Sequence, residues 1–281
     1  MTPDIPHSPC DDILAALRPG DDLVERMAAL LRSAVGRIVL TTSFGLEDQV
    51  LTHAAAAAMA LPEFAGTARR IELATLDTGR LFAETLDVWA ATERRYGLRV
   101  ASLSPDTAEV ESLVAAQGVE GFRESVDARR ACCGVRKVAP LRRALAGTSL
   151  WITGLRADQS EAREATPFAT WDEPLGVVKA APLADWSRDD VARYAAQNRV
   201  PLNVLHARGF LSIGCAPCTR AVAPGEPERA GRWWWEDEGR KECGLHRRPS
   251  HAAPHAMPMP EALVPATTAA QASVLEATSW A

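Results

Sequence analysis

The residues with the clearest potential for chemistry are cysteines. Cys215 and Cys218 form a C-x-x-C pair, and Cys132 and Cys133 are adjacent in an earlier segment. Four thiolates are enough for a tetrahedral zinc site or an iron–sulfur cluster. Adjacent ligands suit a zinc knuckle poorly, whereas each ligand of a four-iron cube binds a different iron. We therefore favour an iron–sulfur cluster over zinc, with a dithiol redox pair or buried thiols as the remaining alternatives.

Cys243 stands apart from these four, in the sequence Lys-Glu-Cys-Gly-Leu-His. Arg240, Lys241 and His246 would lower the pKa of its thiol if they face it, while Glu242 acts in the opposite direction. A thiolate near neutral pH is a strong nucleophile. The motif therefore predicts a nucleophilic cysteine, and an ordinary surface cysteine is the alternative.

Stretches with strand and helix patterns alternate along the chain. Expected strands are 37–42, 71–76, 98–103, 149–153 and 177–181; expected helices are 11–18, 21–35, 49–60, 81–96, 107–117, 135–146 and 188–198, the last capped by Ser187. This alternation predicts an α/β fold, with a mostly parallel sheet covered by helices on both faces.

Three of the expected strands end in segments that could bind a ligand: Ser43-Phe-Gly45, Asp77-Thr-Gly79 and Gly154-Leu-Arg156. In parallel sheets, ligands bind at the carboxyl ends of strands, near a switch in strand order. The first segment could hold an anion at a helix start, although it is neither a Walker A loop nor a G-x-G-x-x-G motif. Simple turns and helix caps are equally good interpretations of each segment taken alone.

Arginines near the last strand end and near the C-terminal cysteine have two interpretations. Arg156 and Arg163 suit sulfate or phosphate, but we slightly favour a solvated loop in which they pair with Asp158 and Glu161. Arg229 and Arg232 either bind an anion or pair with Glu226 and Glu228 in solvent. The adjacent Trp-Trp-Trp run at 233–235 is more typical of packing than of adenine stacking.

The composition excludes several classes of protein. The net charge of -5 gives no basic nucleic-acid surface, and no apolar run approaches the ~20 residues that cross a bilayer. The N-terminus lacks the pattern of a secretory signal, so we expect a cytoplasmic protein with reduced thiols. The sequence leaves the oligomeric state open, a homo-oligomer included.

Taken together, the motifs between about Thr41 and His246 resemble the assimilatory adenylyl-sulfate (APS) reductases, relatives of the phosphoadenylyl-sulfate (PAPS) reductases. The motifs are Ser43–Asp48, Leu76–Gly79, Cys132-Cys133 with Lys137, Gly154–Ser160, Pro182–Trp186, Cys215–Cys218 and Glu242–His246. The resemblance implies an adenine-nucleotide α-hydrolase-like fold with a modified PP-loop. Ser43-Phe-Gly45 stands where ATP-cleaving members carry Ser-Gly-Gly, which fits a nucleotide that is bound without cleavage at its α-phosphate.

The resemblance also implies roles for individual residues. Cys243 corresponds to the catalytic nucleophile, and Cys132, Cys133, Cys215 and Cys218 to the ligands of a 4Fe–4S cluster. The implied substrate-binding residues are Ser43, Thr78, Lys137, Gly154, Arg163, Arg229, Arg232 and His246. Residues 1–246 would form the catalytic domain, with a mobile segment 219–246 carrying the nucleophile, and 247–281 an Ala/Pro-rich, disordered tail.

The implied activity is reduction of APS to sulfite and AMP through an S-sulfocysteine on the enzyme. No thioredoxin-like domain follows His246, so we expect a separate thioredoxin, or a similar dithiol, to be the reductant. The cluster cysteines favour APS over PAPS, since PAPS reductases generally lack them. A PAPS reductase is the first alternative, followed by a PP-loop ATP pyrophosphatase or sulfurtransferase and a non-catalytic metal-binding module.

Overall fold

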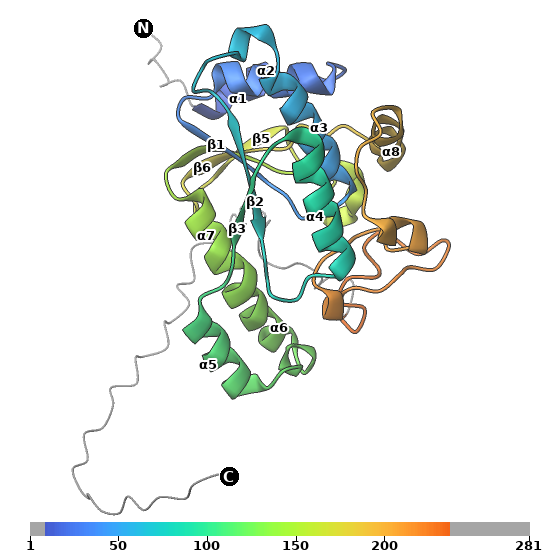
Figure 1. The fold of residues 1–281 in the computed structure, drawn as a ribbon. Coiled ribbons are helices and arrows are strands. Elements are labelled where there is room, and N and C mark those ends of the chain that lie inside the picture. Colours follow the sequence, from blue (N-terminus) through green and yellow to red (C-terminus); the bar gives the residue numbers. More distant parts are fainter. Residues whose placement is uncertain (1–8, 237–281) are drawn as a thin grey trace, which may run out of the picture. The chain divides into compact units, whose positions relative to one another are not determined.

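The fold is built on one six-stranded sheet. The computed structural model describes residues 9–236; these belong to the first of two units, Met1–Arg247 and Arg248–Ala281. The strands are β1 Arg37–Thr41, β2 Ile71–Leu76, β3 Val100–Leu103, β4 Thr148–Ile152, β5 Ala169–Asp172 and β6 Val177–Ala180. They lie in the order β3-β2-β1-β4-β6-β5, and all neighbours are parallel except β5 and β6 (Figure 1). The predicted mostly parallel sheet is confirmed.

Helices cover both faces of this sheet. They are α1 Pro9–Ala16, α2 Leu23–Ser33, α3 Leu46–Met59, α4 Ala83–Tyr96, α5 Thr107–Gln117, α6 Val126–Cys133, α7 Ala139–Leu145 and α8 Arg188–Gln197. Side chains alternate between the faces of a strand, so Leu150 and Ile152 pack with α1, α2, α3 and α8. Trp151 points the other way and packs with α7. Within the described residues, no helix is long and apolar enough to cross a membrane.

Most element boundaries agree with the pattern of the sequence, and the exceptions have physical causes. α5 and β2 match the predicted ranges, and Ser187 caps α8 by accepting a hydrogen bond from the Asp190 amide. α3 begins at Leu46, earlier than predicted. The sequence did not signal this start because the N-cap residue, Gly45, has no side chain that could form a capping hydrogen bond. β5 was not predicted; it is a short antiparallel strand at the edge of the sheet.

The tandem cysteines lie at a junction that the sequence pattern did not predict. They end α6, and a π-helical turn at Gly134–Val138 carries the chain into α7. The predicted helix 135–146 is thus the second half of a longer helical segment. A π-helical turn has one extra residue per hydrogen-bonded ring, and such turns are frequent at functional sites.

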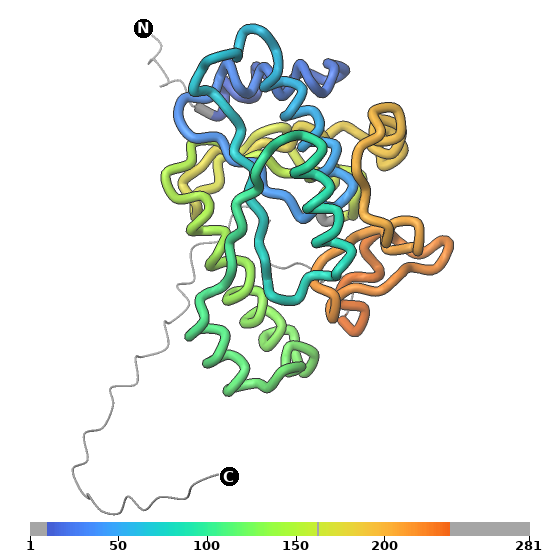
Figure 2. Tube along the Cα trace, viewed as in Figure 1, coloured from blue at the N-terminus to red at the C-terminus, as the bar shows by residue number. Residues whose placement is uncertain are grey.

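Strand order reverses between β1 and β4. From β1 the chain proceeds through β2 to β3 on one side, and β4 then pairs with the other side of β1. Such a reversal leaves a crevice at the carboxyl ends of the two strands. The chain segment after α8 passes beside α4 (Figure 2), where Arg208 forms an ion pair of 2.9 Å with Glu84.

A buried ion pair joins α2 to the segment that follows β6. The Arg26 guanidinium is 0% exposed, donates to both carboxylate oxygens of Asp185 at 2.6 and 2.8 Å, and also donates to the Pro182 carbonyl. Asp185 belongs to the Pro182–Trp186 motif. The motif therefore helps to hold the fold together, because the Asp185 carboxylate compensates the buried charge of Arg26.

Replacing Asp185 by Asn should destabilise the protein, because it leaves the buried Arg26 charge without its counter-charge. We expect a loss of about 2–4 kcal/mol in the free energy of unfolding, measured by urea denaturation. The matched control is Arg32→Ala, which removes exposed ion pairs with Glu25 and Glu63 and should cost about 1 kcal/mol or less. Equal losses in the two variants would contradict the prediction.

Candidate functional site

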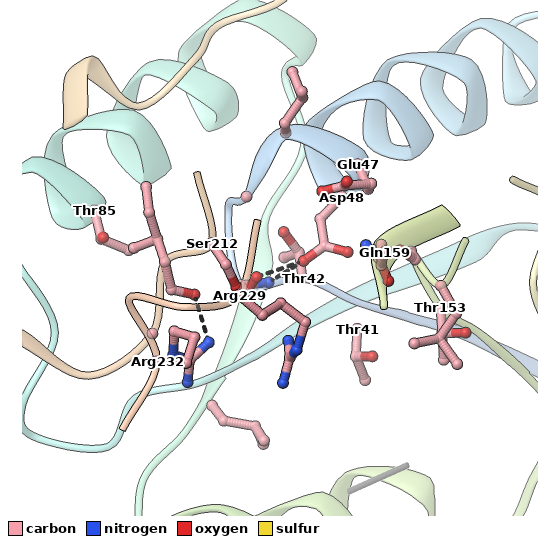
Figure 3. A pocket seen from close by; sticks show the side chains of 18 of the residues that line it. Thr41, Thr42, Glu47, Asp48, Thr85, Thr153, Gln159, Ser212, Arg229 and Arg232 are labelled. Carbon is pink, nitrogen blue, oxygen red and sulfur yellow. Dashed lines mark hydrogen bonds between the residues drawn. The ribbon is translucent and has the colours of Figure 1, made fainter. Parts of the chain in front are cut away.

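A cavity of about 200 Å³ opens where β1 and β4 end. Its walls come from the segments after β1, β2 and β4 and from the chain after α8. The lining includes Thr41, Thr42, Ser43, Gly45, Asp48, Thr78, Lys137, Thr153, Gly154, Arg163, His206, Glu228, Arg229 and Arg232. Figure 3 shows several of these side chains converging from different elements. A cavity therefore lies at the carboxyl ends of the strands, where the sequence predicts a ligand site.

Ser43 and Asp48 form the turn between β1 and α3. The Ser43 amide and hydroxyl both donate to Asp48 Oδ2, at 2.6 and 2.7 Å. Burial raises the pKa of Asp48 to about 6, against the opposing effect of the Ser43 hydrogen bonds. The negative charge of Glu47 adds to the rise, and Arg163 opposes it. A partly buried carboxyl group with a pKa near neutrality therefore lies in the cavity wall.

Two glycines are required by close packing in this wall. A Cβ atom at Gly154 would lie 2.4 Å from Asp48 Oδ1, and one at Gly214 would lie 2.3 Å from an Arg232 guanidinium nitrogen. The first glycine lets the end of β4 approach the start of α3. The second leaves the space that the Arg232 side chain occupies.

Cations gather at one end of the cavity. Lys137, Arg229 and Arg232 all line it, and Arg232 is buried, with its guanidinium donating to the Ile213 carbonyl at 3.4 Å. Arg232 also lies over the Trp233 ring, with 4.7 Å between guanidinium carbon and ring centroid. Paired N–H donors of this kind suit a phosphate or sulfate group.

The four predicted metal-ligand cysteines line a second, smaller cavity next to the first. Cys132 and Cys133 come from the end of α6, and Cys215 and Cys218 from the loop after α8. Lys137, Cys215 and Trp233 line both cavities. Among residues 9–236, no three His, Cys, Asp or Glu side chains are grouped closely enough to hold a single metal ion. The cysteines are thus brought to one place but are not arranged around one ion.

The electrostatic environments of these thiols differ. Burial alone would raise the pKa of Cys215, but Lys137, a 3.3 Å hydrogen bond to Thr78 and Arg232 bring it below its ordinary value. Burial raises the pKa of Cys218 to about 12, and the negative charge of Cys215 adds to this. Cys215 and Cys218 therefore receive part of their stabilisation of negative charge from Lys137 and Arg232, which also line the larger cavity.

Trp233 separates the two cavities. It is 1% exposed, has a backbone φ of 43°, and donates its amide hydrogen to the Cys218 carbonyl at 3.1 Å. Its buried indole N–H has no hydrogen-bond partner among the described residues. A positive φ is strained for a bulky residue, so the surrounding contacts must hold it in place. Trp233 packs against the cysteines, in agreement with the predicted packing role.

The expectation of a solvated loop around Arg156 is wrong. The Arg156 side chain is 0% exposed and bonds Glu47 at 2.9 Å, Asp158 at 3.1 Å and Glu228 at 2.8 Å. Only the pairing with Asp158 was expected, because the other two partners lie far away in the sequence. Arg163, by contrast, lines the cavity and donates to Gln159.

The structure brings together all the described residues that the resemblance implied for substrate binding. Ser43, Thr78, Lys137, Gly154, Arg163, Arg229 and Arg232 line the larger cavity. Cys243 and His246 lie outside the described residues, as do the domain boundary after 246 and the tail 247–281. The sequence analysis assigned no site role to Asp48 or Glu228, although the motif Ser43–Asp48 carried a signal for the first.

The fold and the two cavities define an α/β protein with a polar, cation-lined cavity at its strand-order switch and four cysteines beside it. Residues 37–221 match the phosphoadenosine phosphosulfate reductase domain family. The chain belongs to this family.

Comparisons with individual proteins agree. The chain is 53% identical over 227 residues to an adenosine 5'-phosphosulfate reductase of Sinorhizobium fredii, covering 81% of this chain and 86% of that protein. It is 46% identical over 248 residues to the protein of the same name from Agrobacterium fabrum, covering 88% and 92%. A crystal structure of the PAPS reductase of Candida auris in complex with phosphate superposes with a TM-score of 0.56 at 25% identity, covering 70% and 90%.

The raised pKa of Asp48 predicts a pH dependence of stability. Because the folded-state pKa of about 6 lies above the ordinary value of 3.8, protonation favours the folded state. This contribution is complete below about pH 4 and is lost as the pH rises through about 6, a change of about 3 kcal/mol. Urea unfolding of wild type and Asp48→Asn across this range should give curves whose difference changes with pH in that direction. Parallel curves would contradict the assignment.

Proposed function

We propose that this chain reduces adenosine 5'-phosphosulfate to sulfite and AMP, with Cys243 as the nucleophile and a thioredoxin-like dithiol as the electron donor. The observation that carries the proposal is the shared wall of the two cavities. A nucleotide-type crevice at the strand-order switch meets a four-cysteine centre through Lys137, Cys215 and Trp233. Relatives at 46% to 53% identity carry the name of this activity.

The first proposed step is transfer of the sulfonate group to Cys243. The Cys243 thiolate attacks the sulfur atom of the phosphosulfate, the bond from sulfur to the bridging oxygen breaks, and AMP leaves with the electron pair. Two unit negative charges ~4 Å apart repel by ~4 kcal/mol at an effective dielectric of about 20. Lys137, Arg229 and Arg232 at one end of the cavity would offset this repulsion. His246 is proposed to act with them.

The second proposed step is reductive release. A thioredoxin thiolate attacks the Cys243 sulfur, sulfite leaves with the electron pair, and the second thiol of thioredoxin resolves the mixed disulfide. The dithiol thereby supplies the two electrons. The part of the 219–246 segment beyond Glu236, which carries Cys243, would close over the nucleotide for the first step and open for the second, because a buried ion pair with Arg129 anchors Glu236 itself. This chemistry requires reduced thiols and therefore a compartment such as the cytoplasm.

We further propose that Cys132, Cys133, Cys215 and Cys218 hold a 4Fe–4S cluster. The donor set fits: four thiols line one cavity without being grouped around a single ion, and a cube binds each thiolate to a different iron. The unpartnered indole N–H of Trp233, which lines the same cavity, is available to a sulfur acceptor. When bound, the cluster would contribute to the electrostatic field at Lys137 and orient the loops that carry its ligands.

Replacing Cys243 by Ser should abolish sulfite production and leave APS binding within about twofold of wild type, since the hydroxyl is a far weaker nucleophile at neutral pH. Wild-type protein mixed with APS alone should gain one SO₃ unit on the peptide that contains Cys243, seen by mass spectrometry. Cys10→Ser is the matched control and should retain activity, because Cys10 lies on α1 and lines neither cavity. Turnover by Cys243→Ser would rule out the nucleophile assignment.

PAPS is the competing substrate, because the family includes PAPS reductases and the Candida auris structure is one of them. The same sulfite assay with each nucleotide distinguishes the two. A clear preference of the wild-type protein for PAPS would refute the choice of APS while leaving the reaction class intact.

Replacing Cys133 by Ser should remove the cluster, because it deletes one of four ligands. Anaerobically purified wild-type protein should absorb broadly near about 400 nm and contain about four irons, and the variant should lose both. Bound zinc in the wild-type protein, without this absorption, would contradict the cluster proposal but not the Cys243 chemistry.

A further inference from the structure

Glu228 connects the wall of the larger cavity to a buried network of charges. Its side chain is only 14% exposed, and it bonds Arg156 at 2.8 Å through one oxygen and Arg188 at 3.2 Å through the other. Burial raises the pKa of Glu228, the negative charge of Glu47 adds to this, and the two arginines oppose it. Each carboxylate oxygen of Glu228 thus bonds an arginine from another segment of the chain.

The network joins four separate parts of the chain. Arg156, which follows β4, donates to Glu47 at the start of α3 and to Glu228 in the C-terminal segment. Asp158 accepts from the Arg156 guanidinium and from the Arg188 amide at the start of α8. Removing one carboxylate from such a set leaves a buried guanidinium without full compensation. The position of each member is therefore tied to the positions of the others.

The network reaches the cation end of the cavity through the chain itself. Arg229 is bonded covalently to Glu228, and the Arg229 carbonyl accepts the Arg232 amide at 2.9 Å. Figure 3 shows the Arg229 and Arg232 side chains in the same part of the cavity, with Asp48 and Thr42 in the same view. A shift of the Glu228 backbone would consequently move Arg229, whereas the Arg232 side chain is held separately by the Ile213 carbonyl and the Trp233 ring.

We propose that Glu228 is a positioning residue for the anionic end of the nucleotide. Held by Arg156 and Arg188, it fixes the start of the 228–232 turn so that Arg229 reaches the phosphate or sulfate group. This inference rests on the proposed function for its ligand class, an adenine nucleotide with an anionic tail. Glu228 touches no reacting atom in this role and acts through Arg229.

The test compares AMP and adenosine as probes, by calorimetric titration without reductant. Glu228→Gln keeps the size of the side chain and removes its charge. We expect it to weaken AMP binding about tenfold or more, since the charge-assisted contact between Arg229 and the anion would be displaced. Adenosine, which lacks the anion, should bind within about twofold of wild type. Glu226→Gln is the matched control, because its partner Arg220 is partly exposed and outside the network.

A second readout asks whether Glu228 acts through Arg229. In an Arg229→Ala background, Glu228→Gln should change AMP affinity by less than about twofold, because coupled residues are not additive. The proposal would be overturned in favour of a purely structural role if the losses of AMP affinity in the two single variants multiplied in the double variant. It would also be overturned if Glu228→Gln lost AMP and adenosine binding equally, or if its AMP affinity equalled that of Glu226→Gln.

If Glu228→Gln does not fold, Glu228→Asp serves instead, since it keeps the charge but shortens the reach. An intermediate loss of AMP affinity, again absent in the Arg229→Ala background, is then expected; an AMP affinity within about twofold of wild type would overturn the proposal. Failure of the wild-type protein to bind AMP or APS would refute the proposed function itself. Binding by wild type with no specific effect at Glu228 refutes only this inference.

Discussion

Two neighbouring cavities in this protein are both influenced by the cations Lys137 and Arg232. A nucleotide with a phosphate or sulfate group would bring negative charge to the larger cavity, and the proposed cluster would bring thiolate charge to the cysteine cavity. Lys137 lines both cavities, and both Lys137 and Arg232 lower the pKa of Cys215 against the effect of burial. Charge introduced in either cavity is therefore felt in the other, since Coulomb interactions are strong in partly buried surroundings. The closeness of the two cavities is therefore the condition that the other residues of the site must satisfy.

The fold satisfies this constraint by bringing distant segments to the strand-order switch. β1 and β4 are neighbours, so the turn Ser43–Asp48 meets Gly154 there. The cysteines arrive from two other directions, the end of α6 and the loop after α8. Backbone positions without a Cβ make the approach possible, since a methyl group at Gly154 or Gly214 would occupy the space of Asp48 or Arg232. The cavity is thus shaped by backbone proximity as much as by the side chains that line it.

The sequence predicted the sheet from local signals, whereas the seven described substrate-binding candidates that line the larger cavity were implied by the family resemblance. Strands such as β2 are short apolar runs, and α8 has a capping residue at its start. Ligand positions follow from the rule that parallel strands end at one edge. β5 escaped prediction because an edge strand is only partly buried and has a weak apolar pattern. The early start of α3 escaped because Gly45 provides no capping side chain.

The burial of Arg156 could not be predicted from local sequence patterns. Its neighbours in the sequence include Asp158 and Glu161, so a solvated loop was the reasonable expectation. Its full burial follows from Glu47 and Glu228, which tertiary folding alone brings near it. Arg129 is a second case, because its partner Glu236 is far away in the chain and both side chains are almost fully buried. Local patterns identify which residues carry charge but not which charges will be enclosed together.

The two buried pairs also explain the course of the segment between them. Glu228 is held by Arg156 at one end of this segment, and Glu236 is held by Arg129 on α6 at the other. Buried ion pairs add little net stability, because desolvation offsets most of the Coulomb attraction. Their effect is geometric, because each ion pair fixes the relative positions of the two segments that it joins. Between them lie Arg229, Arg232 and the strained Trp233, whose backbone φ of 43° requires such restraint. The segment that separates the two cavities is therefore anchored at both ends by charges rather than by apolar packing alone.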